Sequence, residues 1–433
     1  MASTTLTSNS TTAVSLTRSA DTLVVAAGAS LITSLDAVEL AGAFVARNVL
    51  IDGRIISAGD DGVSLGSFDE FTFDPIFSSG DDIMISAGGG ILAEDAGITG
   101  NANLLRLNNA GAITGARGVI VTGDGNTVIN SGVINSGEIN SASFGILLSG
   151  DGGAVANSGE ITSGGVAVQL SGSSLSLSNS GVIAVDSGVA AQISGETGAT
   201  ARIVNSGVID GSVVVTFANA TLINTGVITG DIDLGAGSDT LKLLAGVVGG
   251  DVTAGPGDDV IFLSAVDFEV SGGEGTDTLS VIRNTVLGLD IENLTLRGGD
   301  ALKGVGNSAA NLITGNRGDN TLKGLAGADT LNGGRGDDLL IGGSAKDGAR
   351  DTFVFNLDCG ADRIRGFQIS GAGDDRIDLS DFGENEAFDS FVDLNTNSMR
   401  QSGKNVIIDL PGDDQVTVEN VTLADFRASD FIF

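Results

Sequence analysis

Short runs of alternating apolar and polar residues fill the middle of the chain, and a common corner motif separates them. Runs such as GVIVTG at 118–123 and FGILLSG at 144–150 place apolar side chains on one face of an expected strand. Between the runs, Asn-Ser-Gly-x-Ile or a close relative recurs at intervals of 21, 27, 22, 26 and 19 residues. The motif begins at Asn109, Asn130, Asn157, Asn179, Asn205 and Asn224. An interval of about 20 residues is typical of one coil of a repeat protein.

The repeat predicts a parallel β-solenoid over residues 48–231. Strands this short cannot bury an apolar face alone, whereas coils stacked about 4.8 Å apart give each strand two parallel neighbours. At the corner, we expect Gly to supply positive φ and the repeated Asn to stack its amide from coil to coil. The alternative is an antiparallel β-sandwich with turns at similar spacing, but its turns would not repeat one motif.

Two segments depart from this rhythm. Residues 1–47 are expected to cap the first coil or to serve in assembly, and 34–46 fit a helical and a strand period equally well. Residues Phe68–Phe77 carry four phenylalanines. They form either a loop folded over the solenoid flank or an exposed contact for another subunit.

From residue 233 onward the pattern changes to acidic, glycine-rich nonapeptides of the form G-G-x-G-x-D-x-U-x, where U is apolar. Three separated copies begin at 234, 254 and 272, and their sixth-position acids lie 20 and 18 residues apart. A tandem set follows, comprising GNSAANLIT at 306–314, GNRGDNTLK at 315–323, GLAGADTLN at 324–332, GGRGDDLLI at 333–341 and a degenerate GGSAKD at 342–347.

These residue types predict calcium sites. Glycine turns expose carbonyl oxygens, Asp adds negative charge, and such all-oxygen sites suit Ca²⁺ better than Zn²⁺. A glycine-rich solenoid without metal is the poorer alternative, because its carboxylates would repel one another. The candidate metal-binding residues are Gly235, Gly237, Asp239, Gly255, Gly257, Asp259, Gly273, Gly275, Asp277, Gly318, Asn320, Gly327, Asp329, Gly334, Gly336, Asp338 and Asp347.

The nonapeptides resemble those of the RTX (haemolysin-type) calcium-binding family. The resemblance implies a β-roll with two nonapeptides per turn, so that Asn311, Asp329 and Asp347 share one edge while Asn320 and Asp338 share the other. Calcium would lie between neighbouring turns on one edge. Because Ala309 replaces a turn glycine and two of these positions carry Asn, the edges at Asn311 and Asn320 should bind calcium more weakly or lie at the end of the roll.

The C-terminal segment resembles the region that follows the β-roll in serralysin-type secreted proteins, and residues 406–433 resemble a type I secretion signal. The HExxH helix of the serralysin protease is absent, so protease activity is not implied. The expected domains are a cap or assembly segment (1–47), a parallel β-helix (48–231), a calcium-binding β-roll (232–350) and a C-terminal cap with the secretion signal (351–433). The first basic residue is Arg18, so we expect no cleaved signal peptide.

Composition and charge narrow the functional classes. The 433 residues include no His, Trp or Tyr and a single Cys, Cys359. This composition excludes His-dependent nucleophilic catalysis, His-ligated zinc sites and an internal disulfide. The net charge of −34 disfavours nucleic acid and anionic membranes, and no apolar run is long enough to span a bilayer. The charge is uneven, because residues 101–230 contain 7 acidic and 3 basic residues whereas 233–433 contain 34 and 15.

We therefore expect a secreted, non-enzymatic structural protein that folds on calcium and self-assembles as a surface layer or filament at the cell surface or in the matrix. The similarity to RTX surface-layer proteins is compositional. The expected partners are further copies of the chain, the type I secretion apparatus and a cell-surface polysaccharide. The alternatives are a calcium-dependent adhesin or ligand-binding solenoid and, third, a β-helix polysaccharide lyase or hydrolase.

Overall fold

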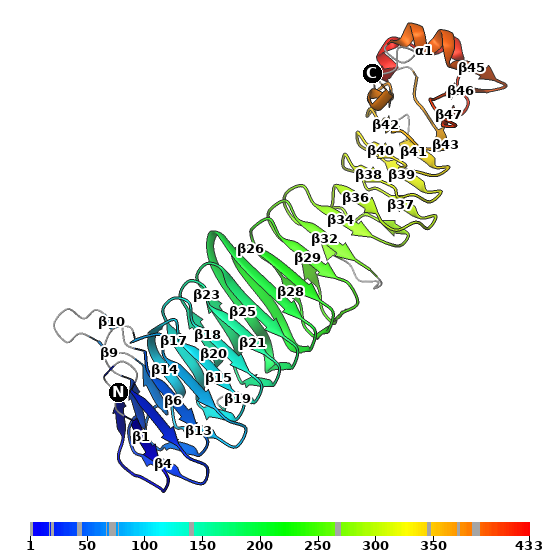
Figure 1. The fold of residues 1–433 in the computed structure, drawn as a ribbon. Helices are drawn as coiled ribbons and strands as arrows, with labels where there is room; N and C mark the ends of the chain where they lie inside the picture. The colour runs from blue at the N-terminus through cyan, green and yellow to red at the C-terminus, as the bar shows by residue number, and fades with distance from the viewer. Residues whose placement is uncertain are drawn as a thin grey trace. The chain divides into compact units, whose positions relative to one another are not determined.

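The protein is almost entirely β-structure. The computed structural model describes residues 3–16, 18, 21–40, 46–65, 67–68, 75–76, 78–137, 143–264, 270–343, 348–369, 373–382 and 390–433. The chain divides into two compact units, Met1–Pro256 (unit 1) and Gly257–Phe433 (unit 2), and each is described by itself (Figure 1). Among the described residues, no helix is both long and apolar enough to cross a membrane.

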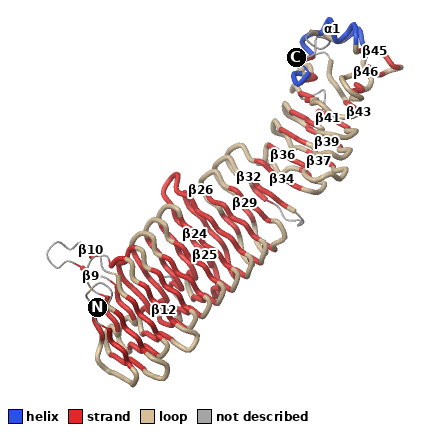
Figure 2. The backbone as a smooth tube through the Cα atoms, viewed as in Figure 1, coloured by secondary structure: helices blue, strands red, loops and turns tan. Residues whose placement is uncertain are grey.

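Unit 1 is the predicted parallel β-solenoid, with three strands in each coil. One coil contains β18 (Thr127–Asn130), β19 (Val133–Ser136) and β20 (Phe144–Ser149). Each of these strands pairs in parallel with a strand of the following coil, namely β21 (Ala154–Asn157), β22 (Glu160–Ser163) and β23 (Val166–Ser171). Figure 2 shows the strands of successive coils of unit 1 lying side by side. The parallel pairing confirms the solenoid and excludes the antiparallel sandwich.

The strands of unit 1 stack into three parallel sheets. The first sheet contains β1 (Ser3–Leu6), β3 (Thr22–Val25), β6 (Asn48–Ile51), β12 (Asp82–Ile85), β15 (Arg106–Asn109), β18, β21, β24 (Leu175–Asn179) and β29 (Thr240–Leu243). The second contains β4 (Ser30–Thr33), β7 (Arg54–Ser57), β13 (Gly90–Ala93), β16 (Ala112–Gly115), β19, β22, β27 (Val227–Ile228) and β30 (Val247–Val248). The third contains β2 (Val14–Leu16), β5 (Val38–Leu40), β8 (Val63–Leu65), β14 (Ala96–Asn103), β17 (Arg117–Thr122), β20, β23, β28 (Ile232–Asp233) and β31 (Val252–Thr253). The long strands β25 (Val182–Asn205) and β26 (Val208–Asn224) run through all three sheets.

The Asn-Ser-Gly-x-Ile motif builds both the corner and the core. Its asparagines are buried and form a ladder in which each Nδ2 donates to the Oδ1 of the next, at 2.8 to 2.9 Å from Asn109 to Asn224. Its isoleucines stack in register on the inner face and are fully buried. These isoleucines are Ile113, Ile134, Ile161, Ile183, Ile209 and Ile228.

The corner glycines serve a purpose that differs from the expected one. Gly132 does not have positive φ. A Cβ there would lie 2.0 Å from the carbonyl oxygen of Gly111 on the preceding coil. Glycine is therefore required because the coils approach closely at this corner, rather than because the backbone is left-handed.

The N-terminal segment is built of strands. Strands β3, β4 and β5 stack in parallel on β6, β7 and β8. The ambiguous stretch 34–46 contains strand β5, while residues 41–45 lie outside the described residues. In the phenylalanine-rich segment the structure gives a short antiparallel pair, β9 (Ser67–Phe68) with β10 (Pro75–Ile76), followed by β11 (Ser78–Ser79). Residues 69–74 and 77 are not described, so an assembly role for either segment stays a prediction.

Unit 2 is a β-roll with two sheets. Register steps of 18 residues, as in Leu312↔Thr330 and Thr321↔Leu339, confirm two nonapeptides per turn. The first sheet contains β32 (Val260–Leu263), β34 (Thr278–Val281), β36 (Asn293–Leu296), β38 (Leu312–Thr314), β40 (Thr330–Asn332), β42 (Thr352–Val354), β44 (Arg376–Asp378) and β48 (Phe431–Ile432). The second contains β35 (Thr285–Val286), β37 (Lys303–Val305), β39 (Thr321–Leu325), β41 (Leu339–Gly343), β43 (Ala361–Arg365), β47 (Gln415–Val418), β46 (Asn405–Asp409) and β45 (Met399–Ser402). The two-residue strand β33 (Val270–Ser271) also belongs to this unit.

The C-terminal residues close the roll. Strands β45, β46 and β47 form an antiparallel meander, and β47 pairs in parallel with β43. The helix α1 (Phe391–Asn397) and the 3-10 helices η1 (Ser380–Phe382), η2 (Leu423–Asp425) and η3 (Ala428–Asp430) lie in this part. Phe353, Phe367, Phe426 and Phe431 form a chain of ring contacts with centroids 5.5 to 5.9 Å apart. The stretch that resembles a secretion signal is thus part of the folded end of the roll.

Candidate calcium sites

Buried carboxylates line both edges of the roll in unit 2. Three of the candidate acids, Asp277, Asp329 and Asp338, come directly before a strand, and the Oδ1 atom of each accepts the backbone N–H of the equivalent residue one turn earlier. On one edge, Asp277 accepts from Asp259 at 2.9 Å, and Asp329 accepts from Asn311 at 2.9 Å. On the other edge, Asp338 accepts from Asn320 at 2.6 Å. The exposed fraction of each of these four Asp residues is at most 1%.

The second oxygen of these carboxylates is the feature that fits a cation. The Oδ2 atoms of Asp277, Asp338 and Asp362 are buried and have no hydrogen-bond partner among the described residues. A buried carboxylate oxygen without a donor is costly, unless a bound ion satisfies it. Calcium prefers such oxygen ligands, so the donor set fits Ca²⁺.

The first glycine of each nonapeptide leaves room for this carboxylate. A Cβ on Gly324 or Gly333 would lie 2.1 Å from Oδ2 of Asp329 or Asp338, respectively. The other predicted turn glycines have positive φ apart from Gly318, whose Cβ would instead meet the carbonyl oxygen of Gly299 at 2.6 Å. Those with positive φ are Gly235, Gly237, Gly255, Gly257, Gly273, Gly275, Gly327, Gly334 and Gly336.

Burial and mutual repulsion perturb these acids. Burial, with further contributions from Asp319 and Asp337, raises the pKa of Asp338 to about 7. Burial, with repulsion from Asp338, raises the pKa of Asp362 to about 8. Burial likewise raises the pKa of Asp277. A divalent cation between the turns would compensate this concentration of negative charge.

The other predicted site residues are placed as follows. Asp239 belongs to unit 1, where it is 2% exposed and its Oδ1 accepts the N–H of Ala220 at 2.6 Å. Asp347 lies outside the described residues. Asn311 and Asn320 use their amides within the protein, because their Nδ2 atoms donate to the carbonyl oxygens of Glu292 at 3.1 Å and Asp300 at 3.5 Å. The turn of Asn311 and Asn320 does not lie at the end of the roll, because β36 and β37 precede it and β40 and β41 follow it. Weaker calcium binding at these two positions stays a prediction.

Sequence reasoning missed three acids that continue the two edges. Asp351 accepts the N–H of Asp329 at 3.0 Å, Asp362 accepts that of Asp338 at 2.8 Å, and Asp375 accepts that of Asp351 at 3.0 Å. Their steps of 22, 24 and 24 residues hide them from an 18-residue repeat. The signal that could have found them is the tripeptide Asp-x-apolar at the start of β42, β43 and β44.

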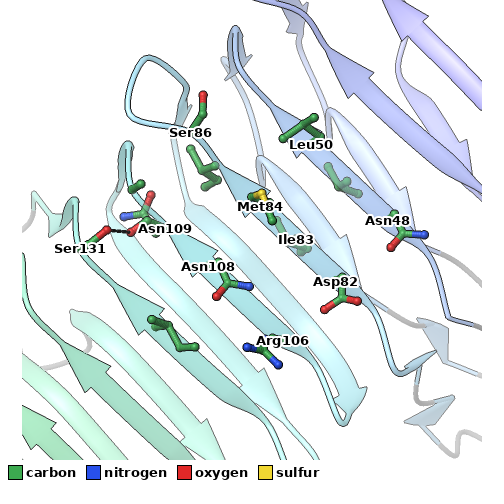
Figure 3. Close-up of a pocket in the computed structure, with 14 residues that line it drawn as sticks. Asn48, Leu50, Asp82, Ile83, Met84, Ser86, Arg106, Asn108, Asn109 and Ser131 are labelled. Atoms are coloured by element: carbon green, nitrogen blue, oxygen red, sulfur yellow. Dashed lines mark hydrogen bonds between the residues drawn. The ribbon is translucent and has the colours of Figure 1, made fainter.

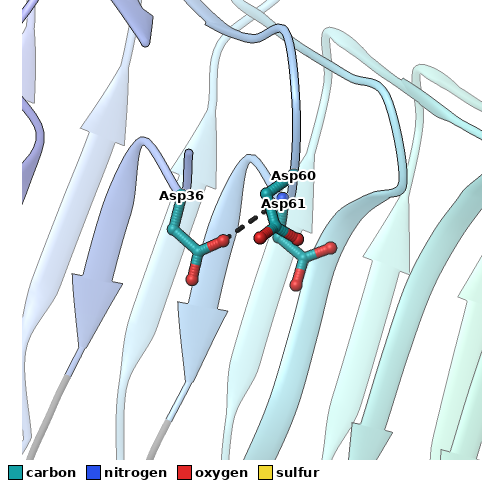
Figure 4. A group of neighbouring side chains, drawn as sticks. All are labelled: Asp36, Asp60 and Asp61. Atoms are coloured by element: carbon teal, nitrogen blue, oxygen red, sulfur yellow. Dashed lines mark hydrogen bonds between the residues drawn. The ribbon is translucent and has the colours of Figure 1, made fainter. Parts of the chain in front are cut away.

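Unit 1 contains a further acidic group away from the repeats. Asp36, Asp60 and Asp61 each offer a carboxylate oxygen within 4.8 Å of the others, and all three are half-buried (Figure 4). Asp36 Oδ1 accepts the N–H of Asp61 at 3.3 Å, and Asp61 Oδ1 accepts that of Ala96 at 3.0 Å. Burial, with the repulsion of its acidic neighbours, raises the pKa of Asp61 to about 6.

An open pocket lies on the outer face of the first sheet of unit 1 (Figure 3). Its lining includes Asn48, Asp82 and Arg106 at register-equivalent positions of β6, β12 and β15, together with Met84, which is 53% exposed. These side chains follow the strand spacing rather than converging on one point. The absence of an enzymatic activity stays our expectation.

Comparison with protein-family models identifies the repeats. A model described as the RTX calcium-binding nonapeptide repeat matches residues 305–347 with four copies. The chain is therefore a parallel β-solenoid with RTX repeats, a repeat type that binds Ca²⁺ and occurs in general in secreted proteins. Comparison with curated proteins found no match to the chain.

Proposed function

We propose that this chain is a secreted structural protein without enzymatic activity, whose roll orders on binding calcium and which then self-assembles at the cell surface or in the extracellular matrix. The observation that carries the proposal is the pair of buried carboxylate edges in and beyond the matched RTX repeats. The compositional similarity to RTX surface-layer proteins supports the surface-layer form.

Calcium would act as the cross-link between successive turns of the roll. Asp338 and Asp362 are at most 2% exposed, and a buried carboxylate without compensation opposes folding. Extracellular calcium modules bind with dissociation constants of about 10⁻⁴ to 10⁻³ M. Because the complete site exists only in the folded roll, its binding free energy becomes folding free energy.

Self-assembly is supported by the distribution of charge. The solenoid coils between residues 101 and 230 are nearly neutral in a chain with a net charge of −34. Copies can therefore approach along these coils with little repulsion, while the acidic roll repels its neighbours until calcium neutralises it. Calcium would thus order the roll and lower the repulsion between copies.

A ligand-binding solenoid or adhesin is the second candidate. The pocket of Figure 3 supports it, because its rows of Asn48, Asp82 and Arg106 repeat at the strand spacing and could follow a regular polymer such as a polysaccharide. It differs from the first candidate in needing no association between copies.

Sedimentation velocity and electron microscopy of the full chain, in millimolar calcium and in EDTA, would test the proposal. We expect ordered assemblies in calcium and smaller, less compact particles in EDTA. A protein that orders on calcium yet stays monomeric at high concentration would contradict self-assembly and favour the second candidate. Asp338→Asn should weaken assembly, whereas Asp124→Asn, on an exposed turn of unit 1, is the matched control.

A further inference from the structure

One buried position recurs in the coils of unit 1, immediately before or at the start of each strand of the first sheet. We call this series the corner row. Strand register places its members on successive coils, since Thr22 pairs with Asn48, Asn48 with Asp82, and Thr221 with Thr240. The corner row runs through Asp21, Arg47, Asp81, Leu105, Asn126, Gly153, Leu175, Ala201, Ala220 and Asp239. The calcium candidate Asp239 therefore shares its position with Arg47 and Asn126.

Two acids of the corner row, Asp81 and Asp239, are held in the same way. Asp239 Oδ1 accepts the N–H of Ala220 at 2.6 Å, and Asp81 Oδ1 accepts the N–H of Arg47 at 2.9 Å. Asn126 Oδ1 accepts the N–H of Leu105 at 2.9 Å in the same manner. At each of these three positions, a side-chain oxygen accepts a backbone N–H of the preceding coil. This holds whether or not the residue belongs to a nonapeptide.

The members of the corner row differ in the groups that bind the other buried oxygens at this corner. Arg47 is fully buried, and its Nε and Nη2 donate to the two carboxylate oxygens of Asp81, both at 3.0 Å. Its Nη1 donates to the carbonyl oxygen of Leu16 at 3.1 Å. The guanidinium thus joins carboxylate and carbonyl oxygens of neighbouring coils, which is the combination of ligands that calcium takes.

Asn126 also joins oxygens of neighbouring coils, but its amide carries no charge. It is fully buried, and its Nδ2 donates to the carbonyl oxygens of Ala102 and Gly123, both at 2.7 Å. Ala102 and Gly123 belong to successive coils, so one amide links two turns.

We propose that Arg47 and Asn126 take the place of calcium in the corner row, so that the coils from Asp21 to Asn130 stay folded without calcium while the roll of unit 2 depends on it. Arg47 supplies the positive charge that Asp81 needs, and it cannot be removed by a chelator. The amide of Asn126 satisfies carbonyls that a bare corner would leave without a donor. The first coils would therefore form a calcium-independent base in a chain whose roll responds to calcium.

Hydrogen–deuterium exchange with mass spectrometry on the full chain tests this proposal. We expect peptides covering β6, β12 and β15 to keep the same protection in millimolar calcium and in EDTA. Peptides covering β40, β42 and β43 should lose protection in EDTA. The proposal is overturned if β6 and β12 open in EDTA together with β40. If β40 stays protected in EDTA while β6 does too, calcium ordering of the roll fails instead, and the two ideas are separated.

Substitution of Arg47 tests the assigned residue. Arg47→Gln leaves Asp81 buried without its cation, so β6 and β12 should exchange faster in calcium and in EDTA alike. Arg47→Lys, which keeps the charge but loses the two-pronged contact, should restore part of the protection. Arg202→Gln, an exposed change on β25 of the same sheet, is the control and should leave the exchange of β6 and β12 unchanged. Unchanged exchange of β6 and β12 in Arg47→Gln would overturn the assignment, and if that variant does not fold, the wild-type comparison decides.

Discussion

Replacing Asp338 with Asn should have opposite effects on the calcium-free and calcium-bound roll. The substitution keeps the shape of the side chain and the oxygen that accepts the N–H of Asn320. It removes the charge that burial, with Asp319 and Asp337, opposes in the absence of metal. Without calcium the change should therefore stabilise the roll, whereas with calcium it removes an anionic ligand.

The magnitudes of the stabilisation without calcium and of the loss with calcium can be worked out from the structure. A rise of the Asp338 pKa from 3.8 to about 7 corresponds to about 4 kcal/mol for ionising the carboxyl in the calcium-free fold. Solvent screening at the edge of the roll reduces this to about 2 kcal/mol. One calcium ion present at about ten times its dissociation constant contributes about 1.4 kcal/mol. Asp338 faces a turn on each side, so the stabilisation by calcium should fall by about 1.4 kcal/mol or more.

The direction in which the stability of the calcium-free roll changes with pH follows from the protons bound in the folded and unfolded states. A carboxyl with a raised pKa binds more protons in the folded state, so the calcium-free roll loses stability as pH rises from about 4 to about 7. The gain from Asp338→Asn in EDTA should therefore be full at pH 8 and vanish near pH 4. Urea unfolding followed by circular dichroism, with and without calcium, measures both effects, and Asp124→Asn is the control. Equal stabilisation of variant and wild type by calcium, or a less stable variant in EDTA at pH 8, would refute the reasoning.

Three further predictions concern other parts of the chain. Asp329→Ala should lower calcium affinity in titration calorimetry while Asp124→Ala should not, because only the former carboxylate is buried at a turn edge; equal affinities would contradict the assignment. Asn157→Ala removes two bonds of the amide ladder, those to Asn130 and Asn179 at 2.8 Å, so unfolding stability should fall by about 2 to 3 kcal/mol regardless of calcium. Asp61→Asn should flatten the expected decline in stability between about pH 4 and pH 6, measured by urea unfolding, because burial raises the pKa of this half-buried carboxyl; an unchanged pH profile would argue against the raised pKa.

The solenoid and the roll could both be predicted from the sequence, because each repeats one motif whose residues act on the backbone. Asn at the corner and Ile two strand positions beyond Gly fix the register between coils, and one slipped residue would bury the wrong face. Calcium binding could be predicted from the Asp at the sixth position of the nonapeptides. The role of the corner glycine could not be predicted from the sequence. A Cβ added at Gly132 would lie 2.0 Å from the carbonyl oxygen of Gly111, and this distance depends on the separation of the coils rather than on a local φ angle.

The acids that sequence reasoning missed show where a repeat stops being visible. Between Asp329 and Asp351 the step grows to 22 residues, and between Asp351 and Asp375 to 24. The step along the sequence grows, while the Asp before or at the start of each strand keeps its place in the hydrogen-bonded ladder. Pairing between strands is thus preserved where the spacing in the sequence is not, and only the structure reveals the additional carboxylates.

Arg47 is a second case that the sequence repeats do not reveal, because it belongs to no nonapeptide and would not be compared with a calcium ligand. Only strand register places it in the corner row with Asp239, and only then does its contact with Asp81 resemble the binding of a metal ion. Several coils of a stacked fold share one electrostatic problem, namely polar oxygens that face inward at a corner without water. The chain solves this problem with a guanidinium at Arg47, with an amide at Asn126 and, in the nonapeptides, with carboxylates that bind calcium. Which solution a coil uses determines whether that coil responds to calcium, and this difference can be tested coil by coil.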